Sequence, residues 1–398
     1  MKRLVFFALF AAIFSASAFS YDFGLVLDQG GKFSDDVNSY SAGFVPWFSW
    51  GTNEKLQLYF SGNLTIKYEG DDWHRPLPLF EIGRFEADYM LAPGTALKAG
   101  RIAYGDSSGL VASGLFDGVN GNLDWRLGRL FLGAYYTGLL YKETAEITMT
   151  GEDSFDYYAP WDADDMGSYF APRRLLATLR YDIPGILGAL NNLSLETIFQ
   201  FDVSAHDNPL HSQYIEVGYA LFPIRYFQVD LGLIVEGMES KAKNFQAAFA
   251  GYADVKMDIP GSLKDRFSLG IRVSSGKAND TVTAFNPING NSMGMVFAPK
   301  FSSITVISGI YEARLLETLS LDFEARYFLR TDTSNTGYGG IIDSDSPGLG
   351  AEFYNSFIWA PLDDISCTLG GGVFFPGKAF ASKTPVKWNI SMGLILSL

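Results

Sequence analysis

Charged side chains stand at alternate positions along many short segments of this sequence, opposite runs of apolar residues. Arginine and carboxylate groups fixed on such polar faces could line a water-filled passage and sort solutes by charge and dipole. The other interpretation is that they pair with one another and serve only the fold. The main candidates on these faces are Arg84, Glu86, Asp88, Arg129, Arg180, Asp254, Arg272, Asp322, Glu324 and Arg326.

The same faces carry further charges, and acids outnumber arginines among them. These additional residues are Arg330, Glu196, Asp202, Glu216, Asp230, Glu236 and Glu352. A water-filled passage with net negative walls concentrates cations, so the pattern predicts a mild cation preference. Arginines at the narrowest point would reverse it, and Arg84, Arg129 and Arg326 are expected mid-strand.

A second chemical feature is the segment 143–172, which has eight acidic residues and no lysine or arginine. Its default interpretation is a solvated outer loop, although its aromatic residues also suit sugar stacking or a lid over a pore. Asp162, Asp164 and Asp165 could offer oxygen ligands to calcium, but their spacing does not match an EF-hand. These three are weak metal candidates, and no cofactor is expected.

Catalytic chemistry has little support in the sequence. The three histidines all fall in expected loops. Only the pair His206 and Asp207, beside Asp71 and Asp72, resembles the acid–base residues of a barrel protease, which lie at the outer rim of the barrel (a rim protease set). The chain has no phosphate-binding loop, CxxC or HExxH motif. We therefore expect this protein not to be an enzyme.

The elements that must hold these side chains are β-strands, because the apolar residues recur with a period of two. The pattern is clearest over 55–68 and again over 386–398, where only Ile395 breaks it. The segment 304–315 is ambiguous, since Glu312 and Arg314 share a face with Ile304 and Val306. Strands with one continuous apolar face suit a closed barrel in lipid, where no edge remains unpaired.

The first 18 residues resemble an export signal. Lys2 and Arg3 precede the apolar run 4–14, and Ala16-Ser17-Ala18 offers a small-residue cleavage site. Cleavage after Ala18 would leave residues 19–398. These contain no linker and no change in composition or patterning, so they are expected to form one domain. The net charge of −14 argues against nucleic acid as a partner.

The connections between the expected strands alternate in length. Those after odd-numbered strands are mostly long and polar, whereas those after even-numbered strands are mostly short. Short periplasmic turns and long outer loops are typical of bacterial outer-membrane barrels. The sequence thus predicts an all-β fold, a transmembrane antiparallel β-barrel of about 16–18 strands with periplasmic N- and C-termini.

One stretch carries a family resemblance. Residues 97–121 read LKAGRIAYGDSSGLVASGLFDGVNG, and the GR, YG and FDGV elements resemble outer-membrane channels of the alginate-export kind. The resemblance implies that Arg101 and Asp117 lie at the lumen near an outer loop. An alginate substrate does not follow, because acids outnumber arginines on the expected inner faces. The final strand also resembles the C-terminal insertion signal of outer-membrane proteins, except that Leu398 replaces the usual aromatic residue.

Together these features predict a porin-like channel of the bacterial outer membrane for passive diffusion of small hydrophilic solutes. Its partners would be the lipid bilayer, the barrel-assembly machinery and the solutes, and its oligomeric state stays open. The competing interpretation is a non-conducting structural or adhesive barrel, filled by loops or side chains.

Overall fold

The computed structural model describes residues 19–52, 55–70, 77–162, 164–186, 188, 190–241, 243–289, 292–335, 337–338, 342 and 344–398. The expected signal peptide, residues 1–18, lies outside these residues. The expected histidine–aspartate rim set is only half described, because Asp71 and Asp72 are also outside them.

The described chain consists mainly of 18 β-strands. The first nine are β1 (Phe19–Ser34), β2 (Ser39–Thr52), β3 (Leu56–Glu69), β4 (Leu77–Ala92), β5 (Thr95–Gly105), β6 (Ser113–Trp125), β7 (Gly128–Tyr136), β8 (Arg174–Pro184) and β9 (Asn191–Asp202). The others are β10 (Leu210–Ile224), β11 (Phe227–Ser240), β12 (Lys243–Ile259), β13 (Asp265–Ser274), β14 (Ile304–Leu316), β15 (Leu319–Arg330), β16 (Gly348–Leu362), β17 (Ile365–Pro376) and β18 (Lys387–Ser397).

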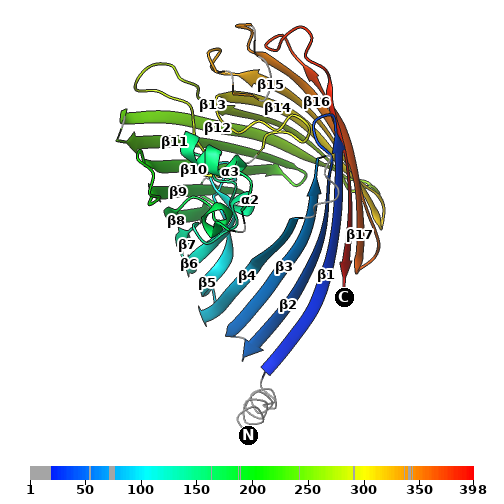
Figure 1. Ribbon diagram of the computed structural model, residues 1–398. Helices are drawn as coiled ribbons and strands as arrows, with labels where there is room; N and C mark the ends of the chain where they lie inside the picture. The colour runs from blue at the N-terminus through cyan, green and yellow to red at the C-terminus, as the bar shows by residue number, and fades with distance from the viewer. Residues whose placement is uncertain are drawn as a thin grey trace.

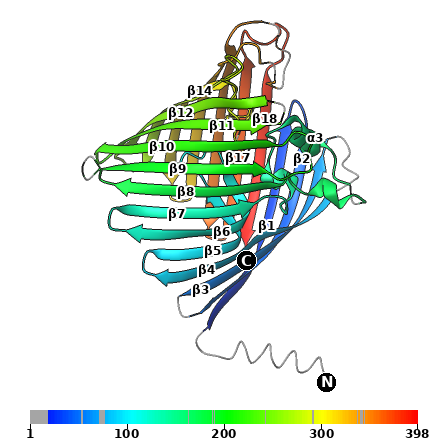
Figure 2. The ribbon, with the colours of Figure 1, turned by 90° about the vertical axis from the view of Figure 1, so that its left-hand side faces the viewer.

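These strands close into one antiparallel barrel. Each strand pairs with its neighbours in the sequence, and β1 pairs with β18, with Val26 opposite Ser397 and Ser34 opposite Asn389. Figures 1 and 2 show the closed wall from two sides. The predicted fold class is therefore confirmed, with 18 strands, although the side on which the termini lie stays a prediction.

The alternation of connection lengths is present, with exceptions. Turns after even-numbered strands are short, and the longest connections, 137–173, 275–303 and 331–347, follow odd-numbered strands. Local pairing sets two of the boundaries. The first hairpin continues to Ser34 and its loop is only 35–38, because glycines 30 and 31 pair regularly with β2. Strand β7 ends at Tyr136, because the chain there turns into the barrel.

The outward face carries the apolar residues that the period of two predicts. On β18, Trp388, Ile390 and Met392 are exposed, as are Phe323 and Tyr327 on β15. A continuous apolar outer surface of this kind requires a hydrocarbon medium around it. A β-bulge at Gly83 shifts the phase of β4, so that Phe80 and Ile82 face outward together with Phe85 further along the strand.

The inward face differs from the sequence prediction, because it carries a second hydrophobic core. Inward apolar residues of β5–β17, such as Ile102, Ile198 and Phe328, are fully buried under loops that fold into the barrel. We name this arc the packed wall. Val306 and Ile304 belong to it, which explains why the phase of β14 was ambiguous.

The remaining arc, β18 and β1–β4, we name the open wall. Among the described residues, no member of the inner core comes from these five strands. Many of their inward residues are polar or charged, including Lys32, Asn63, Thr65 and Lys67, although Trp47 and Leu79 also face inward. The barrel thus has one side filled by its own loops and one side free to line a passage.

Two short helices and a 3-10 turn lie within the connection 137–173. They are α2 (Lys142–Ala145), α3 (Gly151–Tyr158) and η1 (Met166–Tyr169). Figure 1 shows α2 and α3 in the angle between β1–β4 and β5–β12. Within the described chain, no helix has the length and apolarity needed to cross a membrane.

Candidate functional site: the lumen and its inward loops

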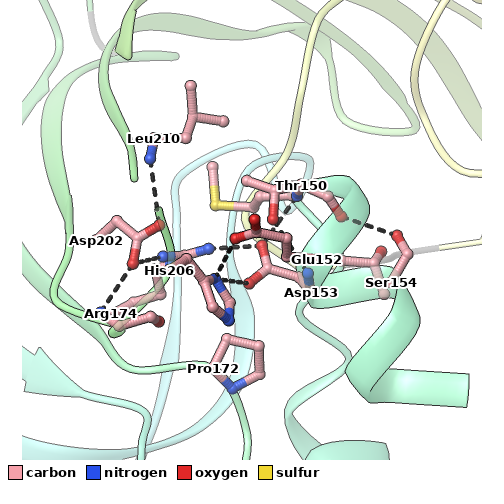
Figure 3. Close-up of polar contacts among 12 residues, drawn as sticks. Thr150, Glu152, Asp153, Ser154, Pro172, Arg174, Asp202, His206 and Leu210 are labelled. Atoms are coloured by element: carbon pink, nitrogen blue, oxygen red, sulfur yellow. Dashed lines mark hydrogen bonds and ion pairs between the residues drawn. The ribbon is translucent and has the colours of Figure 1, made fainter. Parts of the chain in front are cut away.

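The connection 137–173 folds inward and is anchored by a buried charge cluster at α3. Helix α3 begins at a capping box, in which Thr150 and Asp153 exchange side-chain to backbone hydrogen bonds. Arg174 on β8 donates to the Asp153 carboxylate at 2.5 Å and also pairs with Asp202 on β9. All three charged side chains are 0% exposed. Figure 3 shows Arg174 between Asp153 and Asp202.

His206 completes this cluster. Its ring nitrogens lie 3.4 Å from carboxylate oxygens of Glu152 and Asp156 and 3.8 Å from Asp153. Figure 3 shows His206 directed toward α3. The segment predicted to be a solvated acidic loop is therefore partly buried, because Asp153 pairs with Arg174 of the packed wall. His206 and Asp153 hold the loop in place, and the rim protease set gains no support from this geometry.

The connection 275–303 folds into the lumen and is fixed at two points by carboxylates of the wall. On β16, Glu352 accepts the backbone N–H groups of Met295, Val296 and Phe297 at 2.8, 2.9 and 2.7 Å. Five strands away, Glu236 of β11 accepts the N–H of Asn286 at 2.8 Å. Because both carboxylates are engaged by the loop, they do not act as free lumen charges.

Lys300 links the two inward connections. Its amine donates to the carbonyl of Thr148 at 2.8 Å and to the side-chain oxygen of Asn286 at 3.1 Å. Burial lowers the pKa of Lys300 to about 8, and the nearby Glu236 and Asp153 carboxylates oppose that shift. Sequence reasoning missed this residue, since nothing in its neighbourhood marks it as more than a loop lysine.

The third inward connection, 106–112, is a tight loop organised by Asp106. Its carboxylate accepts the N–H groups of Leu110, Val111 and Ala112. The next residue, Ser107, contacts the wall: its N–H donates to Glu196 at 2.7 Å and its hydroxyl to Glu216 at 2.9 Å. These two inward acids therefore also serve loop packing.

Beside the connection 106–112, a polar cavity of about 340 Å³ lies against the packed wall and is lined by Ser107, Asp254 and Arg272. Two further cavities adjoin each other. One, of about 500 Å³, lies among Tyr157, Tyr158, Lys300 and Tyr338. The other, of about 270 Å³, is lined by the open wall, with Lys32, Lys67, Glu69 and the 387–389 end of β18. Both are bounded by Val296 and Lys387, so they meet at the connection 275–303.

Most predicted lumen charges are paired with a neighbour on the wall. Arg84 contacts Glu86 and stacks over Tyr59 at 4.7 Å, and its side chain is 43% exposed. Further pairs join Asp88 to Lys98, Arg180 to Asp182 and Glu196, Asp254 to Arg272, and Arg326 to Glu324 and Glu352. Asp322 accepts a hydrogen bond from Ser356 at 3.3 Å.

Arg129 does not lie mid-strand as predicted. It is the second residue of β7, next to the short turn, and it pairs with the exposed Asp124 at 2.6 Å. It therefore cannot form a constriction with Arg84 and Arg326. The lysines of the open wall were not among the residues singled out from the sequence.

Arg101 and Asp117 lie on the outward face of the wall, contrary to the family resemblance. Arg101 is opposite Phe85 on β4 and opposite Asp117 on β6, and Phe85 is exposed. The inward positions of the same strands are Ile102 and Phe116, which are buried in the inner core. Two hydrogen bonds of 2.9 and 3.0 Å join Arg101 to Asp117.

The weak metal candidates are used locally. The Asp162 carboxylate accepts the N–H of Asp164, and the Asp165 carboxylate accepts the N–H of Gly167. Such turns are the usual role of aspartate in loops. Among the described residues, no cluster of three or more histidine, cysteine or acidic side chains could hold a metal ion.

Solved structures with this architecture include several proteins of Pseudomonas aeruginosa, among them the outer-membrane protein OpdK. OpdK with vanillate matches with a TM-score of 0.64 and 14% identity, covering 95% of this chain and 98% of the other. OccK5 (OpdH) matches with a TM-score of 0.61 and 12% identity, covering 95% and 98%. OprD matches with a TM-score of 0.56 and 13% identity, covering 96% and 97%.

This chain has the fold of those proteins. At such low identity the likeness concerns the fold alone. No family model matches the sequence. No curated protein sequence matches it either.

Proposed function

We propose that this protein is a channel of the bacterial outer membrane through which small hydrophilic solutes diffuse passively. The observation that carries the proposal is the contrast between the two arcs of the barrel. The inward loops pack on β5–β17, whereas the open wall lines a polar cavity that meets a second cavity at the connection 275–303. A barrel of 18 strands is wide enough to leave such an aqueous passage.

The membrane context follows from the same physics. The outward apolar surface requires a bilayer, and the closed sheet leaves its backbone groups satisfied there. We assign the short turns and both termini to the periplasm, and the connections 137–173 and 275–303 to the outer side. The alternating C-terminal strand is the segment offered to the barrel-assembly machinery.

The charges of the passage support a weak rather than a strong ionic preference. The cavity on the open wall is lined by Lys32, Lys67 and Lys387 as well as Asp35, Asp36 and Glu69. Many of the other inward acids, including Glu236 and Glu352, are engaged by loop N–H groups. The cation preference predicted from counting acids therefore rests on fewer free carboxylates than the sequence indicates.

Solute flux into liposomes tests the channel directly. The protein is purified with Cys367 replaced by serine and with Ser39→Cys on the open wall, then treated with a bulky water-soluble thiol reagent. Vesicle swelling in sugars, amino acids and vanillate should fall with solute size and drop further after modification. The matched control is Lys55→Cys at a turn, where modification should change nothing.

A structural or adhesive barrel is the second candidate. The observation that favours it is the extent to which three connections fill the packed wall. Folded protein that passes none of the tested solutes, with or without modification, would support this alternative and contradict the channel.

A further inference from the structure

Between β4 and β5 the ladder of hydrogen bonds ends although both strands continue. Their pairing runs from Ala92 opposite Thr95 up to Phe85 opposite Arg101 and stops there. Beyond this point, residues 77–84 of β4 pair only with β3, and residues 102–105 of β5 pair only with β6, among the residues that the structure describes. The wall therefore forks on the side of the long connections.

Two glycines set the fork. The bulge at Gly83 changes the course of β4. On β5, Gly100 has φ +117°, and an added Cβ would lie 1.9 Å from the carbonyl oxygen of Phe85. Only glycine tolerates this backbone at such close approach. The GR element of the sequence thus shapes the wall rather than the lumen.

A strap closes the fork, and we define it as residues 138–144 and 166–172. Its two arms are joined to each other by a bridge between Tyr141 and Phe170. Toward β4, Tyr169 donates its hydroxyl to the carbonyl of Phe80 at 2.9 Å, and Thr144 donates to Glu81 at 3.0 Å. At the apex of the fork, where β4 and β5 separate, Arg101 donates to the carbonyls of Ile82 and Leu139 at 2.6 and 2.9 Å.

These contacts differ in kind from the rest of the wall. The hydrogen bonds from Tyr169 and Thr144 of the strap to β4 both involve side chains, whereas neighbouring strands such as β7 and β8 are joined by a backbone ladder. An unpaired strand edge in hydrocarbon is costly, so natural barrels avoid it or cover it. Moving the strap would break a few side-chain contacts and leave the ladders intact.

The fork connects a lipid-level surface with the passage. On its outer side stand Phe80, Ile82, Phe85 and Leu139, all exposed and apolar. On its inner side, Glu143 of the strap pairs at 3.0 Å with Lys67, which lines the cavity on the open wall. The strap therefore joins the fork to Lys67, one of the residues that line that cavity.

From this arrangement we propose that the β4–β5 seam is a lateral portal. The strap moves aside to let a single-chain amphiphile with a small polar head pass between the lumen and the membrane. The head would exchange contacts with Lys67 and Glu143, while the chain leaves past Phe80 and Phe85. Arg101 and Asp117 form the fixed apex of the portal and play no part in selecting water-borne solutes.

Photolabelling tests the portal without relying on conductance. The protein, with Cys367 replaced by serine, is placed in lipid nanodiscs with a dodecyl glucoside that carries a diazirine beside the sugar. Mass spectrometry after illumination should find label on residues 32–39 of the cavity. A short thiol cross-link between Glu81→Cys and Thr144→Cys locks the strap and should remove most of that label.

Two comparison variants make the result decisive. A cross-link between Asp322→Cys and Ser356→Cys, whose native side-chain atoms are 3.3 Å apart on a continuous ladder, should leave the label unchanged. Tyr169→Phe, which removes the bond to Phe80, should increase it. Equal cavity labelling with and without the strap lock would show entry by the aqueous mouth alone, and absence of cavity label in all variants would equally overturn the portal.

Discussion

The packed wall and the open wall use the same strand pattern for opposite purposes. On β5–β17 many inward residues near the long connections are apolar and hold loops by burial. On β18 and β1–β4 the inward residues contact the loops through polar groups, as Lys67 does with Glu143 and Asn389 with the carbonyl of Met295. On the packed wall the charges are internal anchors, such as Arg174 and Glu352, with little exposure. On the open wall Lys32 and Arg84 remain exposed to the lumen. Loops packed on one arc of the wall thus narrow the lumen, and the polar arc is left to line the passage.

The largest expected effect comes from removing the anchor of the packed wall. Arg174→Met leaves the Asp153 and Asp202 carboxylates buried without their cation, a loss of about 3–5 kcal/mol. Thermal unfolding in detergent should shift accordingly, and proteolysis near α3 should become faster. Arg129→Met, in an exposed pair at a turn, is the matched control and should change little.

The next effect concerns the outer surface that both walls share. Phe323→Arg places a charge on the lipid-facing side of β15 and should destabilise the barrel by roughly 2–4 kcal/mol if it lies near mid-membrane. Asp322→Asn on the inward face should be far milder. Folding titrations into bilayers measure both, and equal losses would contradict the assignment of faces.

A smaller effect is expected from Lys300, where the packed wall meets the cavity. Its pKa of about 8 lies below its ordinary 10.5, so between these values the unfolded chain binds more protons than the folded one. Stability therefore rises with pH through this window and is unaffected below it, on the order of 1 kcal/mol for a partly buried amine. Protease resistance of 275–303 should rise accordingly, and Lys300→Met should abolish the trend.

The smallest structural perturbation tests the open wall. Lys32 lines its cavity and has no ion pair within the described part of the chain. Lys32→Glu reverses one charge within roughly a Debye length of 8–10 Å of the passage. Reversal potentials in a salt gradient should move toward the cation, more strongly at low salt. Arg129→Glu, beside a turn, should move them less.

The strands were predictable because their signal is local. A period of two and the turn spacing determine a strand and its outward face, as β18 and β15 illustrate. The inner core was not predictable, because an inward apolar residue such as Ile198 looks the same in sequence as a lipid-facing one. Only β14 gave a hint, since Ile304 and Val306 share a face with Glu312.

The site was predictable in part. The inward charges were found by their phase, but their roles depend on loops that return from far along the chain. Glu352 and Met295 lie 57 positions apart, so no local pattern relates them. The Thr150–Asp153 capping box was a local signal for α3 and could have indicated an ordered loop. The family resemblance placed Arg101 at the lumen, whereas it faces outward. The strap covers it there, and the carbonyls of Ile82 and Leu139 accept its hydrogen bonds.

Single-channel recording in planar bilayers tests the central claim most directly. Purified, folded protein should give stepwise openings, and Ser39→Cys in the Cys367→Ser background should lose most of its conductance after reaction with a bulky thiol reagent. The same reagent on Lys55→Cys should leave the steps unchanged. Absence of any openings from protein shown to be folded, or steps insensitive to modification at residue 39, would contradict a passage along the open wall.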